Sequence, residues 1–246
     1  MRLLESLYQQ LRQQRRMQFF RTKSVLCSFF FILFSLAFSA CAESDDEEQL
    51  GEYADWQARN EAYFLTLEDS LNSNPAVWRK LRTYSMTDKA TTANTDYVYV
   101  KVLQTSELTE LTESPIYTDT VRVAYRGRLI PSASYPQGYV FDQTYVGNFD
   151  LRTTDVSNLA VKGYVDGFAT ALQHMHIGDQ WRIYIPYQLG YGTTAKSSIP
   201  AYSTLIFDLV LIDFVSGSDK MEPWSARGGA LRLVNKGGAL RLVNKE

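Results

Sequence analysis

The stretch VDGFATALQHMHIGDQWRIYIP, residues 165–186, changes its hydrophobic period part of the way along. In its first half the apolar residues fall at i, i+3, i+4 and i+7, the spacing of one face of an α-helix: Val165, Phe168, Ala169 and Leu172. In its second half they fall at every other position, the spacing of a strand: Trp181, Ile183 and Ile185. Gly178 stands between the halves, where a helix stop is expected. The stretch therefore predicts a short amphipathic helix followed by a strand.

Three other segments have the two-residue period of strands. They are DYVYVKVL (residues 96–103), TVRVAYRGRLI (residues 120–130) and STLIFDLVLIDF (residues 203–214). The last carries apolar residues on both faces, which predicts a central strand. In the second, apolar residues alternate with Arg122, Arg126 and Arg128, which predicts a sheet with one polar face. With the helix, these strands predict an α+β domain over residues 96–215, an antiparallel sheet with one helix laid across it.

The segment before this domain has a helical pattern. Over residues 46–72 apolar residues recur at roughly helical spacing with charges between them. Residues 72–75, NSNP, stop the helix, and residues 76–85 are predicted to form a second short helix. We therefore assign residues 42–95 to an acidic tether and a helical extension. Two roles are open for residues 46–85: an arm that makes a homodimer, or a spacer from a membrane.

The N-terminal residues have the pattern of an export signal. No charged residue occurs from residue 24 to residue 42, and the core of this run, FFFILFSLAFSA, follows Arg21 and Lys23. A basic start, an apolar core and small residues before a cleavage point are typical of a secretory signal peptide. The run ends in FSAC, residues 38–41, which resembles the lipobox of bacterial lipoproteins and predicts a lipidated Cys41. A transmembrane anchor is the alternative, since the run is close to the minimum length that spans a membrane.

The lipobox interpretation sets the first boundary and the location of the protein. Residues 1–41 would be the signal peptide, with Met17 as a candidate for the true start. Cys27 would be lost with the signal, so the mature chain would keep Cys41 and have no disulfide. We expect a bacterial outer-membrane lipoprotein that faces the periplasm or the cell surface and is held to the membrane by the lipid on Cys41.

The composition argues against several classes of function. A net charge of −2 gives no basic face, so nucleic-acid binding is not expected. Two histidines are too few for a multi-histidine metal site, and His174 and His176 lie two residues apart, so they do not share a helical face. They are expected at the negative end of the short helix. With no P-loop pattern and no G-x-S-x-G motif, the chain is expected to use neither a metal nor a cofactor.

The C-terminal tail, residues 216–246, contains a perfect repeat. The nonapeptide GGALRLVNK occupies residues 228–236 and again residues 237–245. One repeat does not make a solenoid. We therefore expect a duplication and assign the tail no function.

Five motifs in the 96–215 region occur in a fixed order. They are VAYRGRL (residues 123–129), VFDQT (residues 140–144), the stretch 165–186, LGYG (residues 189–192) and IPAYSTLIFDLVLIDF (residues 199–214). In order and spacing they resemble the FK506-binding-protein (FKBP) family of peptidyl-prolyl cis–trans isomerases. The resemblance implies an antiparallel, strongly curved β-sheet wrapped around one short α-helix. It also implies isomerisation of X–Pro bonds, with proline-containing segments of exported proteins as the partners.

The resemblance also places a pocket beside the helix. Its lining would be Tyr125, Phe141, Val165, Phe168, Ile199 and Phe207. The backbone N–H of Val165 would bind a substrate carbonyl, Asp142 would add a polar contact at the wall, and Tyr191 would offer its hydroxyl. The X–Pro bond isomerises over a barrier of about 18–20 kcal/mol because rotation breaks amide resonance. An aromatic pocket that fits the twisted amide better than the planar forms lowers this barrier without a metal, a nucleophile or a general base.

Several of these assignments have a simpler alternative. Without the resemblance, Phe141 and Phe207 would be core residues and Asp142 the cap of a turn. Phe168 stands where the family usually has tryptophan, which gives a smaller aromatic floor. The candidate for an arginine partner of Asp142 is Arg152. At the level of function, the alternatives are a chaperone or peptide-binding module without turnover, and a structural surface lipoprotein with an inherited, idle fold.

Overall fold

The computed structural model describes residues 51–88, 90, 92–106, 113–221 and 223–224, and the backbone of residues 231–236 and 239–244. The signal peptide, Met17, Cys41 and the acidic tether lie outside the described residues, so these features stay predictions. From Tyr53 onward the described residues belong to one compact unit. None of the helices in this described part is both long enough and apolar enough to cross a membrane.

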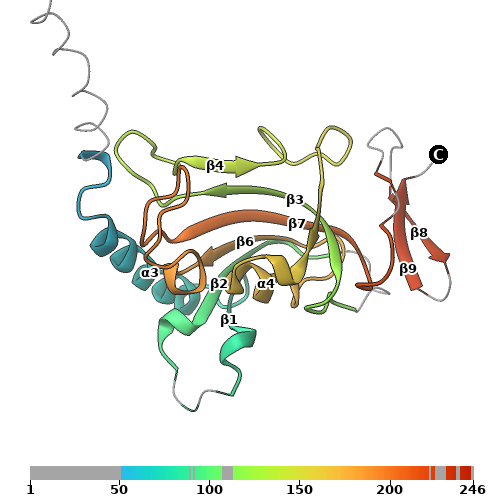
Figure 1. Ribbon diagram of the computed structural model, residues 1–246, viewed down its shortest axis with the longest axis horizontal. Coiled ribbons are helices and arrows are strands. Elements are labelled where there is room, and N and C mark those ends of the chain that lie inside the picture. The colour runs from blue at the N-terminus through green and yellow to red at the C-terminus, as the bar shows by residue number, and fades with distance from the viewer. Residues whose placement is uncertain are drawn as a thin grey trace, which may run out of the picture. The chain divides into compact units, whose positions relative to one another are not determined.

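Seven antiparallel strands form the main sheet, which is curved (Figure 1). They are β1 (Trp78–Arg82), β2 (Tyr97–Gln104), β3 (Thr120–Arg128), β4 (Val140–Gln143), β5 (Ser157–Ala160), β6 (Gln180–Ile185) and β7 (Leu205–Val215). Their order across the sheet is β1-β2-β6-β7-β3-β4, and β5 pairs with the first half of β3. The strand predicted to be central is β7, which lies between β6 and β3. The antiparallel α+β fold is therefore confirmed.

Two α-helices, α3 (Trp56–Ser73) and α4 (Asp166–Leu172), pack on opposite faces of this sheet. Successive residues of a strand point to opposite faces. In β6, Ile185 lies against α4, because a Cβ built on Gly167 would come within 2.3 Å of its Cγ2 atom. The preceding residue, Tyr184, faces α3, and its ring lies 6.5 Å from that of Tyr63. Four short 3-10 helices complete the unit: η1 (Tyr84–Met86), η2 (Asn94–Asp96), η3 (Val161–Gly163) and η4 (Tyr187–Leu189).

The N-terminal helix predicted over residues 46–72 corresponds to α3, which ends at Ser73 within the predicted stop. The buried side chains of α3 recur every three to four residues, as on one face of a helix: Trp56, Asn60, Phe64 and Leu67. The Phe64 ring packs edge-on against Tyr99 of β2 at 5.2 Å. This face is therefore buried within the chain's own compact unit, and a role of residues 46–85 in dimerisation stays a prediction.

The prediction of a second short helix over residues 76–85 is wrong. Residues Trp78–Arg82 form β1, an edge strand that pairs with β2 along its whole length. The chain then turns into η1, where the Thr83 Oγ1 atom lies 3.1 Å from the Thr170 Oγ1 atom on α4. Strand preference depends on neighbours, and a long adjacent strand outweighs the weak local pattern of five residues.

The face of the sheet that was predicted to be polar is partly covered. Arg122 is buried there, with its guanidinium 3.5 Å from the Asp213 carboxylate and 5.5 Å from the Trp224 ring centre. Beside it lies a second small core made of Ala124, Val210 and Ile212. Most of the side chains that cover this core come from residues 145–156, and Trp224 adds to them: Tyr145, Phe149, Leu151, Val156 and Trp224. The alternation of a single strand does not reveal that another segment folds over its polar face.

Gly178 was predicted to end the short helix, and this prediction is wrong. Helix α4 ends at Leu172, and Gln173 is its C-cap. Gly178 lies in the turn before β6 with a φ of 96°, in the left-handed region that favours glycine. A Cβ at this position would also come within 2.9 Å of the Ser106 Oγ atom. A tight turn and the close approach of a neighbouring segment, rather than a helix end, require this glycine.

Each copy of the repeated nonapeptide contributes one strand to a separate two-stranded sheet. β8 (Leu231–Lys236) and β9 (Ala239–Asn244) pair in antiparallel fashion, with Leu233 opposite Leu242. We assign no function to this hairpin.

Candidate functional site

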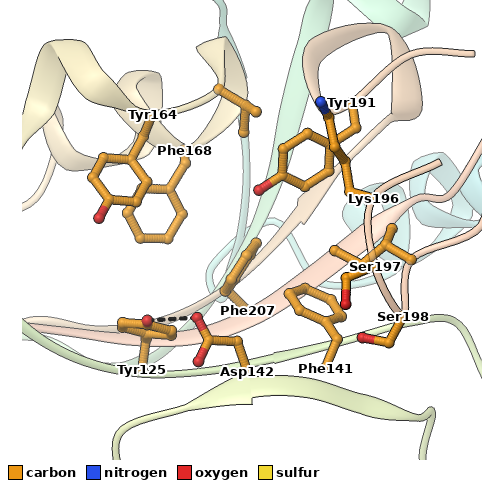
Figure 2. A pocket seen from close by; sticks show the side chains of 12 residues that line it. Tyr125, Phe141, Asp142, Tyr164, Phe168, Tyr191, Lys196, Ser197, Ser198 and Phe207 are labelled. Atoms are coloured by element: carbon orange, nitrogen blue, oxygen red, sulfur yellow. Dashed lines mark hydrogen bonds between the residues drawn. The ribbon is translucent and has the colours of Figure 1, made fainter. Parts of the chain in front are cut away.

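A cavity of about 270 Å³ opens beside the start of α4 (Figure 2). All eight residues that the sequence placed in a pocket line this cavity: Tyr125, Phe141, Asp142, Val165, Phe168, Tyr191, Ile199 and Phe207. They come from β3, β4, the start of α4, β7 and two loops. The curved sheet thus brings together motifs that are spread over residues 123–214.

Aromatic rings form one side of the cavity. Phe168 is 2% exposed, and its ring packs edge-on against that of Phe207 at 5.0 Å. The Phe207 ring in turn lies 5.5 Å from the ring of Phe141 on β4. Edge-to-face pairs of this kind are a favourable arrangement of aromatic rings. The rings therefore hold one another in place and give the cavity an apolar surface.

Gly127 in β3 allows two of these rings to approach the strand. A Cβ built on Gly127 would come within 2.6 Å of both the Phe141 and the Phe207 ring. A side chain at this position would displace one or both rings. The glycine of the VAYRGRL motif is therefore explained by the packing of the cavity wall.

Asp142 on β4 accepts a hydrogen bond of 2.7 Å from the Tyr125 hydroxyl, and both residues border the cavity (Figure 2). Burial raises the pKa of Tyr125 above its ordinary value, and the hydrogen bond to the Asp142 carboxylate raises it further. The hydroxyl therefore stays protonated at neutral pH and remains a donor to Asp142. This pair links the two strands at the wall of the cavity.

The prediction that Arg152 is the partner of Asp142 is wrong. Arg152 pairs with Asp150, two residues away, at 3.1 Å, and both side chains are exposed. The Asp150 carboxylate also accepts a hydrogen bond of 3.0 Å from the Arg152 backbone N–H. A local turn thus supplies the partner of Arg152, and the Tyr125 hydroxyl is a partner of Asp142.

Two hydrogen-bond donors at the cavity are available to a ligand. Val165 is the N-cap residue of α4, and its carbonyl accepts hydrogen bonds from the N–H groups of Phe168 and Ala169. Its own N–H and the Tyr191 hydroxyl have no acceptor within the part of the chain that the structure describes. Tyr191 is 39% exposed, and Figure 2 shows its hydroxyl pointing into the cavity.

Four residues that were not predicted from the sequence also line the cavity: Tyr164, Lys196, Ser197 and Ser198. The Tyr164 ring lies 5.4 Å from the Phe168 ring. The other three belong to a turn in which Lys196 and Ile199 exchange two backbone hydrogen bonds, with Ser197 at a φ of 44°. Each of the four lies next to, or a few positions from, a predicted residue, and this adjacency is the signal that could have found them.

The two histidines lie beyond the C-terminal end of α4. The Nδ1 atom of His174 is 2.8 Å from the Thr170 carbonyl oxygen, and that of His176 is 3.5 Å from the Asp179 carboxylate. Across the described ranges, no group of three or more histidine, cysteine, aspartate or glutamate side chains is placed to hold a metal ion.

Comparison with known proteins shows that this chain is similar to members of one protein family. The family model for FKBP-type peptidyl-prolyl cis-trans isomerases matches residues 112–212. FK506-binding protein 2 of Aspergillus oryzae is 36% identical over 109 residues, which are 44% of this chain and 75% of that protein. The FKBP-type 22 kDa peptidyl-prolyl cis-trans isomerase of Escherichia coli is 35% identical over 102 residues, 41% of this chain and 44% of that protein. The macrophage infectivity potentiator of Trypanosoma cruzi is 39% identical over 105 residues, 42% of this chain and 47% of that protein.

This domain has an antiparallel sheet curved around one short helix and an aromatic cavity at the start of that helix. These features define a domain of the FKBP class. The chain belongs to the family of FKBP-type peptidyl-prolyl cis-trans isomerases, which confirms the resemblance seen in the five motifs. It spans less than half the length of the Escherichia coli and Trypanosoma cruzi relatives, at 44% and 47%. Among solved structures, FkpA from Escherichia coli aligns with 79% of this chain and 83% of its own, with 22% identity and a TM-score of 0.42.

Proposed function

We propose that this protein catalyses cis–trans isomerisation of X–Pro bonds in polypeptides. The observation that carries the proposal is a cavity with aromatic walls and two donors, the Val165 N–H and the Tyr191 hydroxyl, that have no acceptor among the described residues. Isomerisation breaks no covalent bond, so a site for it needs shape, low polarity and a few oriented hydrogen bonds. The described residues of the cavity supply these three properties.

In the proposed mechanism the substrate proline lies against the rings of Phe168 and Phe207. The Val165 N–H donates a hydrogen bond to a carbonyl of the peptide and fixes its orientation. Rotation about the X–Pro bond removes amide resonance and makes the amide less dipolar, so an apolar cavity favours the twisted form over the planar forms. The Tyr191 hydroxyl donates to a second carbonyl as the bond turns. Each 1.36 kcal/mol gained in this way speeds the reaction about tenfold.

Replacement of Tyr191 by phenylalanine is expected to lower kcat/KM for an X–Pro peptide by about five- to tenfold, the value of one hydrogen bond of about 1 kcal/mol. Asp142→Ala is expected to have at least the same effect, because the Tyr125 hydroxyl loses its acceptor and the wall loses its polar contact. The rate is measured by NMR exchange between the cis and trans forms of a short peptide, in protein that begins at residue 42.

Tyr135→Phe provides the matched control for Tyr191→Phe. Tyr135 is similarly exposed, at 41%, and does not line the cavity. Its replacement is expected to leave kcat/KM unchanged. Acceleration by the unaltered protein that neither cavity variant reduces would contradict the roles of Tyr191 and Asp142 while leaving the activity itself established.

A peptide-binding module without turnover is the second candidate, and the observation in its favour is Phe168. A phenylalanine floor is smaller than the tryptophan that the family usually has, so it contacts a proline ring less closely. The same NMR experiment separates the two candidates. Binding of the peptide without faster cis–trans exchange would identify the module.

We further propose that the mature protein is a lipoprotein anchored through Cys41 in a bacterial outer membrane, with exported proteins as its substrates. The support lies in the sequence FSAC after an uncharged apolar run. We expect Cys41→Ser to abolish incorporation of labelled fatty acid and to move the protein from the membrane fraction to the soluble fraction. Cys27→Ser is the control, because that cysteine lies inside the predicted signal; loss of labelling in this variant instead would contradict the assignment.

A further inference from the structure

Helix α3 contacts the two loops that form the mouth of the cavity, although it precedes the residues that match the family model. One loop, residues 187–192, carries Tyr191 and is called here the Tyr191 loop. The other, residues 196–204, carries Ile199 and is called the Ile199 loop. Both loops border the cavity, so their positions decide where a bound peptide meets the Tyr191 hydroxyl.

Two side chains of α3 hold the end of the Ile199 loop. The Trp56 indole N–H donates a hydrogen bond of 2.9 Å to the Ser203 hydroxyl, which donates one of 2.6 Å to the Pro200 carbonyl. The side-chain oxygen of Asn60 accepts a hydrogen bond of 2.7 Å from the Thr204 backbone N–H. Asn60 is fully buried, and its amide group also donates a hydrogen bond of 2.7 Å to the Trp56 carbonyl. A buried N–H that lost such an acceptor would be left unpaired, at a cost of about 1–3 kcal/mol.

The Tyr191 loop is tied to the same helix and to the Ile199 loop. The Tyr187 hydroxyl donates a hydrogen bond of 3.1 Å to the Glu61 carboxylate. The Tyr187 carbonyl accepts the N–H of Gly192 at 2.8 Å, and the Gly192 carbonyl accepts the N–H of Tyr202 at 3.0 Å. The two routes from α3 therefore meet at Gly192, the residue next to Tyr191.

Strain at Tyr202 is an independent sign of this constraint. Its φ of 62° lies in the left-handed region, which costs a residue with a side chain about 1–2 kcal/mol. Such a conformation persists only where the surroundings impose it. The next two residues, Ser203 and Thr204, are those that α3 binds, and the Tyr202 ring packs edge-on against Tyr187 at 5.3 Å.

We propose that α3 is a clamp on the mouth of the cavity, and that Trp56, Asn60 and Glu61 are positioning residues for the isomerisation. The inference rests on the proposed function of the cavity. None of the three residues lines the cavity; they act by fixing the backbone on which Ile199 and Tyr191 are mounted. Displacement of a contacting group by 1 Å can cost about 100-fold in rate, so small movements of these loops matter.

The test compares two clamp variants with a control variant on the same helix face. Asn60→Ala removes the acceptor of the Thr204 N–H, and Trp56→Phe removes the bond to Ser203 while keeping an aromatic ring. Leu67→Ala is the control: Leu67 is 3% exposed and lies about 10 Å from Asn60 along the axis of α3. For each protein kcat and KM are measured with an X–Pro peptide, and hydrogen exchange of the Thr204 amide is followed by NMR, at a temperature where all are folded.

We expect each clamp variant to lower kcat by about tenfold with a smaller change in KM, because the misplaced contacts are those to the twisted amide. The Thr204 amide is expected to exchange at least ten times faster in Asn60→Ala. Leu67→Ala is expected to lower the melting temperature at least as much while leaving kcat and the Thr204 exchange rate close to those of the unaltered protein. Rescue of part of the loss by Asn60→Gln, which restores an acceptor, would support the clamp further.

The clamp is overturned if Leu67→Ala lowers kcat as much as the clamp variants do, since α3 would then act through general stability alone. It is also overturned if both clamp variants keep the kcat of the unaltered protein. Failure of the proposed function looks different: the unaltered protein would not accelerate isomerisation at all. In that case the clamp is still tested by the Thr204 exchange rate and by the affinity for the same peptide. If both values are the same in the clamp variants as in the unaltered protein, the clamp is overturned.

Discussion

Gly127→Ala is expected to lower kcat/KM for an X–Pro peptide by about 10- to 100-fold, one of the two largest effects we predict. The added Cβ would lie 2.6 Å from the Phe141 and Phe207 rings, and Phe207 is 8% exposed, so neither ring can move without disturbing the cavity. Overpacking of this kind also costs about 1–3 kcal/mol of stability. Kinetics on the peptide and urea unfolding of the same protein separate the two effects.

Gly163→Ala is the matched control for this experiment. A Cβ at Gly163 meets no atom within 4 Å, and the residue lies in η3, just before the residues that lead into α4. We expect it to keep both the activity and the stability of the unaltered protein. Full activity of Gly127→Ala would mean that the rings can shift without harm, and the packing explanation for this glycine would have to be abandoned.

Asp208→Ala is expected to destabilise the protein by about 3 kcal/mol, the lower end of the usual cost of removing one partner from a buried ion pair, because this charge network is only partly buried. The Asp208 side chain is 13% exposed and accepts hydrogen bonds from two arginines: Arg128 on β3, and Arg182 on β6 at 2.5 Å and 3.1 Å. Without the carboxylate, two positive charges would face each other across β7 with no counter-charge between them. Urea unfolding monitored by tryptophan fluorescence gives the free energy of unfolding.

Asp150→Ala serves as the comparison, because it removes the same side chain from an exposed pair. The Asp150 carboxylate and its partner Arg152 are 40% and 71% exposed. Exposed pairs contribute about 0–1 kcal/mol, so this variant is expected to unfold at nearly the same urea concentration as the unaltered protein. A similar loss in both variants would show that the Asp208 network is no more than a surface ion pair.

The strands were predictable where one chain segment carried enough pattern to stand alone. The long apolar run of β7 and the alternation in β2, β3 and β6 each identified a strand without knowledge of its neighbours. β1 was missed because WRKLR, residues 78–82, has charges between its apolar residues and owes its conformation to pairing with β2. The partial burial of the face predicted to be polar was not predicted for a related reason. Trp224, which packs against Arg122 on that face, lies far from it along the chain.

The eight cavity residues were predictable because the five motifs carry them. Pattern alone would have left Phe141 and Phe207 as core residues; Phe207 does belong to the core, and the partly buried Phe141 packs against it. The partner of Asp142 was not predictable, because a tyrosine on a paired strand takes the place expected for an arginine. Asn60 was not predicted to lie on the buried face because helical periodicity is defined by apolar residues, and Asn60 is polar. A polar residue four positions after Trp56 and four before Phe64 lies on the buried face, and that alone predicts a hydrogen-bond partner.

The position of β7 bears on how this protein reaches its own native state. β7 is the centre of the main sheet but the last of its seven strands along the chain. During synthesis β3 and β6 therefore lack the strand with which both of them pair until the chain is made to about residue 215. Sheets built on such distant pairings fold slowly, in about milliseconds to seconds. Because the cavity has walls from β3, β4 and β7 together, it is absent from every shorter nascent chain, and activity is expected to appear in one late step.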